Sequence, residues 1–167
     1  MIIISDITPL HYLILLEKAE LLQKLFGIII IPEAVFREMQ HEGTPEVVRK
    51  WIASLPAWVQ VKTPSEKHLG QVKELGKGET EAIALAIEVN ADALLMDDRK
   101  AIREARKNNL LVVTTLGILE LAAAKGLIDF SQTLTQLAET NFRLPSDEII
   151  KEFLKRAAER QIKNSKT

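Results

Sequence analysis

Short apolar runs alternate with helical patterns along this chain, and that alternation constrains the fold more than any other feature. The runs are Ile2–Ser5, Ile28–Ile31, Ala93–Met96 and Leu110–Val113, with Trp58–Val61 as a further short candidate. Nearly all of these residues are apolar, which is typical of strands covered on both faces. Strands that are separated by helices favour a parallel sheet. We therefore predict an α/β fold with three layers, α/β/α, and a central, mainly parallel sheet of four to five strands.

Helix boundaries are predicted from capping residues and from apolar residues at helical spacing. Thr8 is interpreted as an N-cap followed by Pro9 at the first helical position, and this helix runs to about Phe26 with a break near Lys18. Gly27 then ends it. Further helices are expected over residues 33–40, 45–54, 65–74, 79–89, 99–107, 115–126, 130–139 and 146–161, with a turn at 76–78. We divide the chain into a domain over residues 1–125 and a helical extension over 126–167 that packs on the same domain.

The composition excludes several classes of site. The chain has 167 residues and no cysteine, so disulfides, zinc–thiolate sites and thiol catalysis are excluded. Its three histidines lie far apart without ligand-like spacing. The net charge is −1, so any nucleic acid must be bound by local positive charge. We identify no signal peptide and no run approaching the ~20 apolar residues that span a bilayer, so we expect a cytoplasmic protein without a membrane partner.

Acidic residues occur where this fold would bring them together. Asp6 follows the first strand, Asp97 and Asp98 follow the Ala93–Met96 strand, and Glu38 and Glu79 lie on helices between them. Ligands of parallel α/β sheets bind beyond the carboxyl ends of the strands. Converging carboxylates repel one another unless a cation lies among them, and a divalent metal is the usual one. A metal-dependent enzyme is therefore the first hypothesis.

Glu79 is the most informative of these acids. On a helical wheel it falls within a broad apolar face, whereas Glu81 and Glu88 fall on the opposite, solvent-facing side. Either Glu79 interacts with the helix dipole from the first turn, or the start of the apolar face opens onto a functional site.

The other acids also have two interpretations each. Asp97 and Asp98 are adjacent and face different directions, so one can point into the site while the other caps the helix that begins near Arg99. We favour Asp98 as the cap and Asp97 as the ligand, and the reverse stays open. Asp6 can instead help to cap the first helix, and Glu38 can be a solvated surface residue.

Arg99, Lys100 and Arg103 lie on the helix that begins beside Asp97. A charge run of this kind is commonly a solvated face. Next to an acidic site it can also hold a phosphate backbone, so these three residues are the predicted contacts to nucleic acid.

Four short motifs carry a resemblance to a known family. In Ile4–Leu10, the end of a strand is followed by the acid Asp6 and the hydroxyl residue Thr8. In Ile31–Glu38, a helix that begins after Pro32 carries the acid Glu38 near its end. Gly76–Ala86 and Leu94–Ala101 contain the third and fourth acids. In this order and spacing, the motifs resemble the PIN-domain ribonuclease family, and within it the VapC-like toxins. The segment Gly117–Arg156 is also similar to the tail of one poorly characterised PIN subfamily.

The resemblance implies a metal-dependent endoribonuclease that uses Mg²⁺ or Mn²⁺, acts as the toxin of a toxin–antitoxin pair and forms a homodimer. It implies that Asp6, Glu79 and Asp97 bind the metal. It also implies that Glu38 completes the catalytic set by holding a second ion or orienting the attacking water. The spacing to Asp97 favours Glu79 over Glu81 as the third acid. The secondary candidates are Thr8, Glu81 and Asp98.

The sequence departs from the family pattern at three places. Position 7 is Ile where a small hydroxyl residue is common, the third acid is Glu rather than Asp, and no threonine precedes Asp97 at 95 or 96. One alternative is therefore a catalytically weak or inactive binding module that acts through a protein partner. The C-terminal helix offers it an apolar face of Ile149, Ile150, Phe153, Leu154 and Ala157. A phosphatase of the haloacid-dehalogenase type, with Asp6 as nucleophile, is less well supported because position 8 is Thr and not the second acid.

Overall fold

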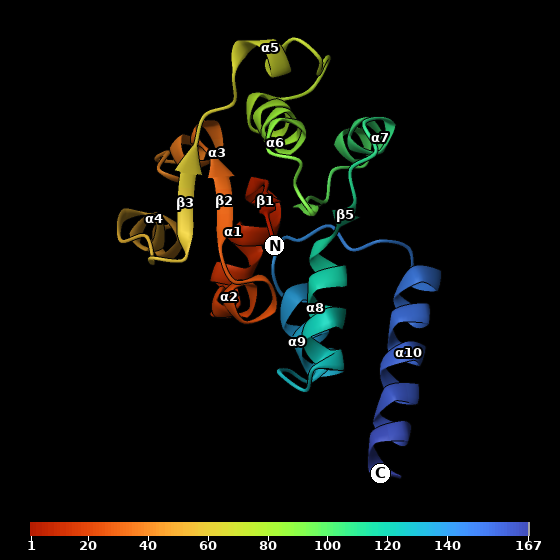
Figure 1. The fold of residues 1–167 in the computed structure, drawn as a ribbon. Coiled ribbons are helices and arrows are strands. Elements are labelled where there is room, and N and C mark those ends of the chain that lie inside the picture. The colour runs from red at the N-terminus through yellow and green to blue at the C-terminus, as the bar shows by residue number, and fades with distance from the viewer. Residues whose placement is uncertain (167) are drawn as a thin grey trace. The chain divides into compact units, whose positions relative to one another are not determined.

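A five-stranded parallel sheet forms the centre of the first part of the chain in a computed structural model of the protein (Figure 1). The strands are β1 (Ile3–Ser5), β2 (Ile29–Pro32), β3 (Val59–Lys62), β4 (Ala93–Leu95) and β5 (Val112–Val113), in the order β3-β2-β1-β4-β5. Every neighbouring pair is parallel. The register sets Ile4 beside Ile30 on one side and Leu94 on the other. The predicted three-layer α/β/α fold is confirmed, and all five predicted strands are present.

The structure describes residues 1–166, which fall into two compact units, Met1–Thr115 and Leu116–Thr167. Each unit is described by itself. The predicted division between residues 125 and 126 stays a prediction.

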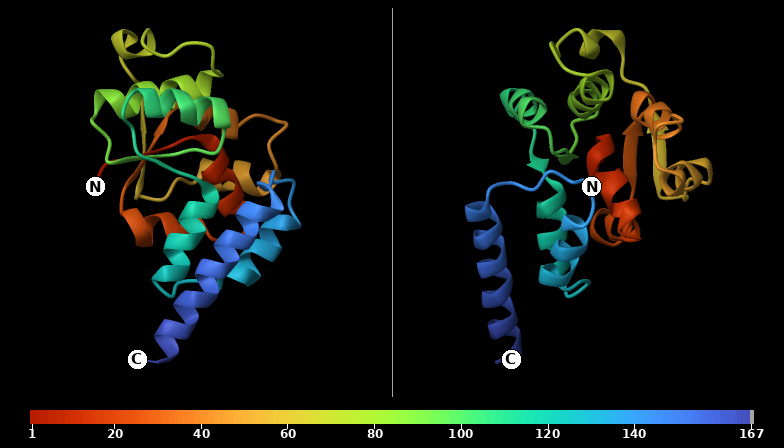
Figure 2. Two further views of the ribbon diagram at one scale, coloured as in Figure 1. Left: turned by 90° about the vertical axis from the view of Figure 1, so that its right-hand side faces the viewer. Right: turned by 180° about the vertical axis from the view of Figure 1, so that it is seen from behind.

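Helices of the first unit cover the sheet on both faces, and their bounds differ from the predicted ones mainly at the ends. They are α1 (Ile7–Leu15), α2 (Glu20–Phe26), α3 (Glu33–Met39), α4 (Glu46–Ala53), α5 (Glu66–Leu69), α6 (Lys77–Glu88) and α7 (Arg99–Lys107). Figure 2 shows α6 and α7 on one side of the sheet, with α1 and α2 on the other.

The two faces of the sheet are set by alternation along each strand. Ile4, Ile30 and Leu94 are buried in one apolar cluster with the inner faces of α6 and α7. Ile3 and Ile29 are completely buried as well, and successive side chains on a strand point to opposite faces, so these two serve the other layer. Burial of both faces explains why the strands are nearly continuous apolar runs.

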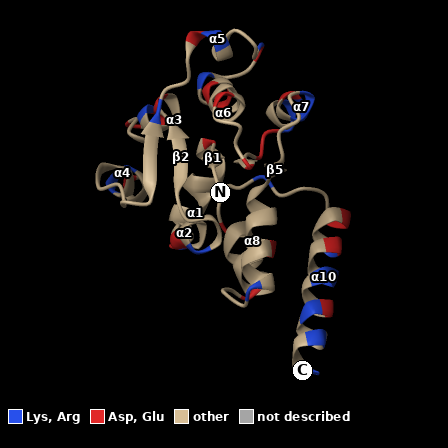
Figure 3. Ribbon diagram, in the orientation of Figure 1, with Lys and Arg blue, Asp and Glu red and all other residues tan. Residues whose placement is uncertain are grey.

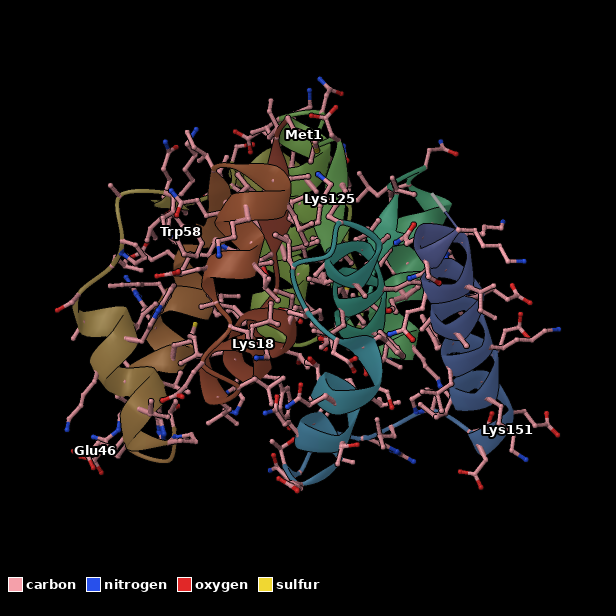
Figure 4. All side chains as sticks on the ribbon, turned by 90° about the horizontal axis from the view of Figure 1, so that it is seen from below. Met1, Lys18, Glu46, Trp58, Lys125 and Lys151 are labelled. Atoms are coloured by element: carbon pink, nitrogen blue, oxygen red, sulfur yellow. The ribbon has the colours of Figure 1, made fainter. Side chains whose placement is uncertain are left out.

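Aromatic packing joins α4 to the edge of the sheet. Trp51 of α4 meets Trp58, directly before β3, in an edge-to-face arrangement with ring centroids 5.9 Å apart. Figure 4 labels Trp58 among the side chains. This contact places α4 beside the outer strand, which has only one neighbouring strand.

Three local predictions change in the structure. Helix α1 begins at Ile7, so Asp6 occupies the N-cap position and Thr8 lies inside the first turn rather than capping it. The predicted turn at 76–78 instead starts α6, because Gly76 is its N-cap and Lys77 is its first residue. The helix predicted over 65–74 shrinks to the single turn α5. The break near Lys18 is confirmed, with Glu17 at a φ of 57°.

The second unit is helical, with α8 (Thr115–Ala124), α9 (Phe130–Ala138) and α10 (Asp147–Ser165). Helix α10 has no buried residue. It is held by Arg156, which binds Glu120 of α8 through two nitrogens at 2.6 and 3.1 Å, and by Arg160, which binds the same carboxylate. Phe153 stacks on Phe130 of α9 with centroids 5.9 Å apart. Part of the apolar face proposed for a partner is therefore used within the unit.

Within residues 1–166, none of the helices is both long enough and apolar enough to cross a membrane.

Candidate active site

Two of the predicted acids follow neighbouring strands at the point where the strand order reverses. Asp6 comes directly after β1, and Asp97 follows β4 with only Met96 between. The backbone N–H of Asp6 donates a hydrogen bond to Leu95 O at 2.9 Å, so the ends of β1 and β4 are hydrogen-bonded to each other. The strand order reverses between β1 and β4, and ligands of open parallel α/β sheets commonly bind beyond the strand ends at such a point. Figure 3 shows acidic residues in red at the end of β1, on α6 and between β4 and α7.

Asp6 is the most perturbed carboxyl group of the site. It is 2% exposed, and burial raises its pKa from 3.8 to about 7. The Ile7 backbone N–H lowers this pKa, whereas the charges of Glu79, Glu38 and Asp97 raise it further. All three other predicted acids are therefore close enough to interact with Asp6. Its Oδ1 is buried and accepts no hydrogen bond from the described residues.

Asp97 is held by Thr115 at the end of the next strand. Asp97 Oδ1 accepts from the Thr115 backbone N–H at 2.9 Å, and Oδ2 accepts from its hydroxyl at 2.5 Å. Burial raises the pKa of Asp97, and these two hydrogen bonds lower it. Each carboxylate oxygen has a second lone pair, so this anchoring leaves Asp97 able to bind an ion.

Asp98 is the N-cap of α7, as the sequence favoured. Its Oδ1 accepts from the Ala101 backbone N–H at 2.8 Å. The adjacent acids thus face different neighbours, Asp97 toward Thr115 and Asp98 toward its own helix. Which of the two binds metal stays a prediction.

Glu79 lies in the first turn of α6 and combines the two interpretations considered for it. Its Oε2 accepts from the Gly76 backbone N–H at 3.3 Å, which is a capping contact. Burial raises the pKa of Glu79, as do the charges of Asp98 and Glu38, while Gly76 and Lys100 lower it. The residue therefore caps its helix and still belongs electrostatically to the acidic group.

Glu38 approaches the same place from α3, and Gly78 makes this approach possible. Burial raises the pKa of the Glu38 carboxyl. The hydrogen bond that this carboxylate accepts from the Gly78 backbone N–H lowers that pKa. A Cβ at position 78 would lie 2.8 Å from Glu38 Oε1 and 3.3 Å from a methyl group of Val35. Only glycine therefore lets the carboxylate of α3 rest against the start of α6.

Glu81 corrects the helical-wheel prediction. It was placed on the solvent side of α6, yet it is 7% exposed, and its Oε2 accepts from the Ala34 backbone N–H at 2.9 Å. Ala34 is the second residue of α3, whose own N-cap, Pro32, has no side-chain acceptor. Glu81 thus caps a different helix from inside the core and fixes α6 against α3. The wheel missed this because it treats α6 as covered on one side, whereas α3 also packs against it.

Replacing Glu81 tests this structural role. We expect Glu81→Ala to lower the free energy of unfolding by about 2–3 kcal/mol, because the Ala34 N–H loses its acceptor in a buried place. Glu81→Gln keeps an acceptor oxygen and should cost less than half as much. Urea denaturation of both variants measures the difference, and equal losses would contradict the capping role.

The remaining predicted residues lie around the acids. Thr8 is half-buried in the first turn of α1, two residues after Asp6. Arg99, Lys100 and Arg103 are exposed on α7, and Lys100 is near enough to lower the pKa of Glu79. The four main acids are thus brought into electrostatic contact, with a basic helix beside them.

The donor groups of this site suit a hard divalent cation. They are all carboxylates, the buried Asp6 Oδ1 lacks a partner, and the pKa values of all four acids are raised. Within residues 1–166, no three acidic or histidine side chains stand close enough to enclose one ion. Mg²⁺ commonly keeps several waters and binds through only one or two carboxylates, so the residues present fit such an ion.

Three contributors were not identified from the sequence. Thr115 anchors Asp97, and Gly78 admits Glu38. Tyr12 lies near Asp97, and burial, together with the charge of Asp97, raises the pKa of its phenol. Only Thr115 had a usable signal, because it lies between a predicted strand and the start of a predicted helix. The other two depend on packing between elements that are distant in sequence.

Comparison with known proteins agrees with this geometry. No curated protein matches the chain. A family model described as a PIN domain matches residues 2–159, which is nearly the whole sequence. PIN domains are generally nucleases, and Asp6, Glu38, Glu79 and Asp97 all lie within this matched region. The chain is a member of the PIN-domain family.

Proposed function

We propose that this protein is a metal-dependent endoribonuclease that hydrolyses RNA phosphodiester bonds with Mg²⁺ or Mn²⁺. The observation that carries the proposal is that the charges of Glu38, Glu79 and Asp97 act on Asp6, whose carboxylate is buried and has one oxygen without a partner among the described residues. Acids whose charges raise the pKa of a buried neighbouring carboxyl group are costly to keep together without a cation. A PIN domain is the setting in which such a group would serve a nuclease.

The side chains divide the work according to their surroundings. Asp6, Glu79 and Asp97 would hold the ion, one or two of them directly and the rest through bound water, and Thr115 keeps the Asp97 carboxylate in place. When bound, the metal lowers the pKa of a water molecule and neutralises charge on the phosphate. Glu38, which faces the group from α3, would orient the attacking water, or hold a second ion. The Thr8 hydroxyl would donate a hydrogen bond to the phosphate or to the Asp6 carboxylate.

Cleavage of a circular single-stranded RNA tests the proposal directly. With Mg²⁺ or Mn²⁺ present we expect linear products, because an endonuclease needs no free end, and excess chelator should abolish them. A matched DNA circle tests the preference for RNA. If neither metal supports cleavage of RNA over a range of sequences, the proposed activity is wrong.

Gly78→Ala offers a test that touches no acid. The new methyl group would displace the flexible end of Glu38, so we expect RNA cleavage to fall about ten- to a hundredfold. Stability should change by no more than about 1 kcal/mol, because alanine favours the helix. Gly70→Ala is the matched control, since a Cβ there meets only ordinary contacts at 3.8 Å. Cleavage rates and thermal unfolding of the two variants decide the matter.

The biological setting belongs to the same proposal. We infer a toxin that is restrained by an antitoxin protein, acts as a homodimer and works in the cytoplasm, on the strength of the resemblance to VapC-like toxins. Light scattering of the purified protein tests the dimer. Co-expression with the product of an adjacent small gene tests the antitoxin, with relief of growth inhibition as the expected result.

A non-enzymatic binding module is the second candidate. It is favoured by one observation, that no three donor side chains within residues 1–166 stand ready to enclose an ion. Mn²⁺ titration separates the two. A thermal shift that disappears in Asp6→Asn supports the enzyme, and the absence of any shift supports the module.

A further inference from the structure

A polar pocket lies beside the acidic site, between α7 and the segment that leads into α6. It has a volume of about 200 Å³. Its lining residues are Lys73, Glu74, Leu75, Lys100, Arg103, Glu104 and Lys107. The four residues from α7 recur at intervals of three and four, so they form one face of that helix. Arg99 and Arg106 of the same helix do not line the pocket.

The pocket carries an excess of positive charge that the protein does not neutralise. Lys107 binds Glu104 at 3.0 Å, and Lys100 lies 4.0 Å from Glu74. Lys73 and Arg103 are exposed and form no ion pair with the described residues 1–166. Two cationic side chains in a concave, polar place are suited to an oxyanion, and an arginine binds phosphate oxygens with particular geometric strength.

The size and lining of the pocket identify the part of a nucleic acid that it fits. Its volume is below the range typical of sites for whole small molecules. No aromatic side chain lines it, so the usual stacking platform for a base is absent there. A single phosphate group matches both features, and contacts to phosphate carry no sequence information.

Lys100 connects this pocket to the acids. It lines the pocket and lies in the first turn of α7, three residues after Asp97. Asp98, the residue next to Asp97, caps the start of the same helix. A phosphate bound in the pocket would therefore lie next to the group that we assign to the metal.

We propose that this pocket is a subsite for a backbone phosphate of RNA that flanks the cleaved bond, bound chiefly by Lys73 and Arg103. The assignment rests on the proposed function, because it gives the pocket a role toward the same substrate. It adds a sequence-independent contact that fixes the strand relative to the acids.

The test is binding of a fluorescein-labelled single-stranded RNA, followed by anisotropy in chelator at several salt concentrations. Arg103→Ala and Lys73→Ala are compared with Arg106→Ala, an exposed arginine on the same helix but outside the pocket. We expect each pocket variant to weaken binding roughly threefold to tenfold and to reduce the salt slope by about 0.7, as for one lost phosphate contact on a single strand. Arg106→Ala should leave the slope unchanged. Equal effects in all three variants, or none in any, overturn the proposal.

Two further arms separate the alternatives. Inorganic phosphate at constant ionic strength tests for a free anion. Thermal stabilisation that depends on Arg103, without an effect of Arg103 on RNA binding, would overturn the RNA subsite in favour of a phosphate site. Cleavage by the wild-type protein in Mn²⁺ is measured in parallel. RNA binding that depends on Lys73 and Arg103, without cleavage by the wild-type protein, would support the subsite and contradict the proposed nuclease activity. Cleavage that is unchanged in the Lys73 and Arg103 variants would contradict the subsite alone.

Discussion

Asp6→Asn is expected to abolish metal-dependent RNA cleavage while the protein stays folded. The substitution keeps the shape of a side chain that is 2% exposed, so packing is preserved. It removes the charge of the most buried acid, to which the other three are electrostatically linked. Bound metal contributes several kcal/mol to such a reaction, so a loss of at least about a thousandfold in rate is expected. Single-turnover cleavage of a labelled RNA measures it.

Two further variants sharpen this result. Asp97→Asn should be equally inactive, whereas Asp98→Asn should retain most cleavage if Asp98 only caps α7. Glu42→Gln, at an exposed position, controls for the loss of a negative charge as such. Full activity in both Asp6→Asn and Asp97→Asn would remove the proposed mechanism. Loss in Asp98→Asn with retention in Asp97→Asn would reverse the assignment of the two neighbours.

The metal-free protein is expected to lose stability as the pH rises from about 4 to about 7. Burial raises the pKa of Asp6 to about 7 in the folded state, from 3.8. Between these values the folded protein holds a proton that the unfolded chain has released, so its advantage is complete below pH 4 and is lost as pH passes 7. At about 1.4 kcal/mol per pKa unit, Asp6 alone accounts for roughly 3 kcal/mol between pH 5 and pH 8.

Urea denaturation in chelator at pH 5 and pH 8 measures this change. The raised pKa values of Glu38, Glu79 and Asp97 act in the same direction. Asp6→Asn should flatten the profile and be more stable than the wild type at pH 8. Mn²⁺ should restore wild-type stability at pH 8 and have little effect at pH 5, because protons and metal compete for the same oxygens. A wild-type profile as flat as that of Asp6→Asn would contradict the assigned burial of this carboxyl.

The strands and the positions of the main acids followed from the sequence because both depend on local pattern. Short apolar runs predict buried strands wherever both faces of a sheet are covered, and all five predicted strands are present here. Asp6 and Asp97 follow such runs directly, so the rule that ligands bind beyond parallel strand ends was sufficient to pair them. Asp98 as an N-cap also followed, since capping involves only residues within one helical turn.

What the sequence could not supply concerns contacts between distant elements. A helical wheel assigned Glu81 to solvent, because a wheel describes only one helix. It does not show that α3 packs against α6, or that the N-cap of α3, Pro32, has no side chain to cap the helix. Gly78 was interpreted as part of a turn, and only the approach of Glu38 explains why a side chain is excluded there. In the same way, nothing in the sequence singles out Lys73, and only the structure shows that it lines a pocket together with residues of α7.

The sequence by itself therefore determined the layers of this protein and the strand ends at which its carboxylates gather, because periodicity and adjacency are properties of the chain. The tertiary structure alone decided how those carboxylates are held. Burial of Asp6, anchoring of Asp97 by Thr115 and the close passage of α3 over Gly78 each join residues that the sequence separates. The physical reason is that desolvation and charge interaction depend on distance in space, which local pattern does not specify.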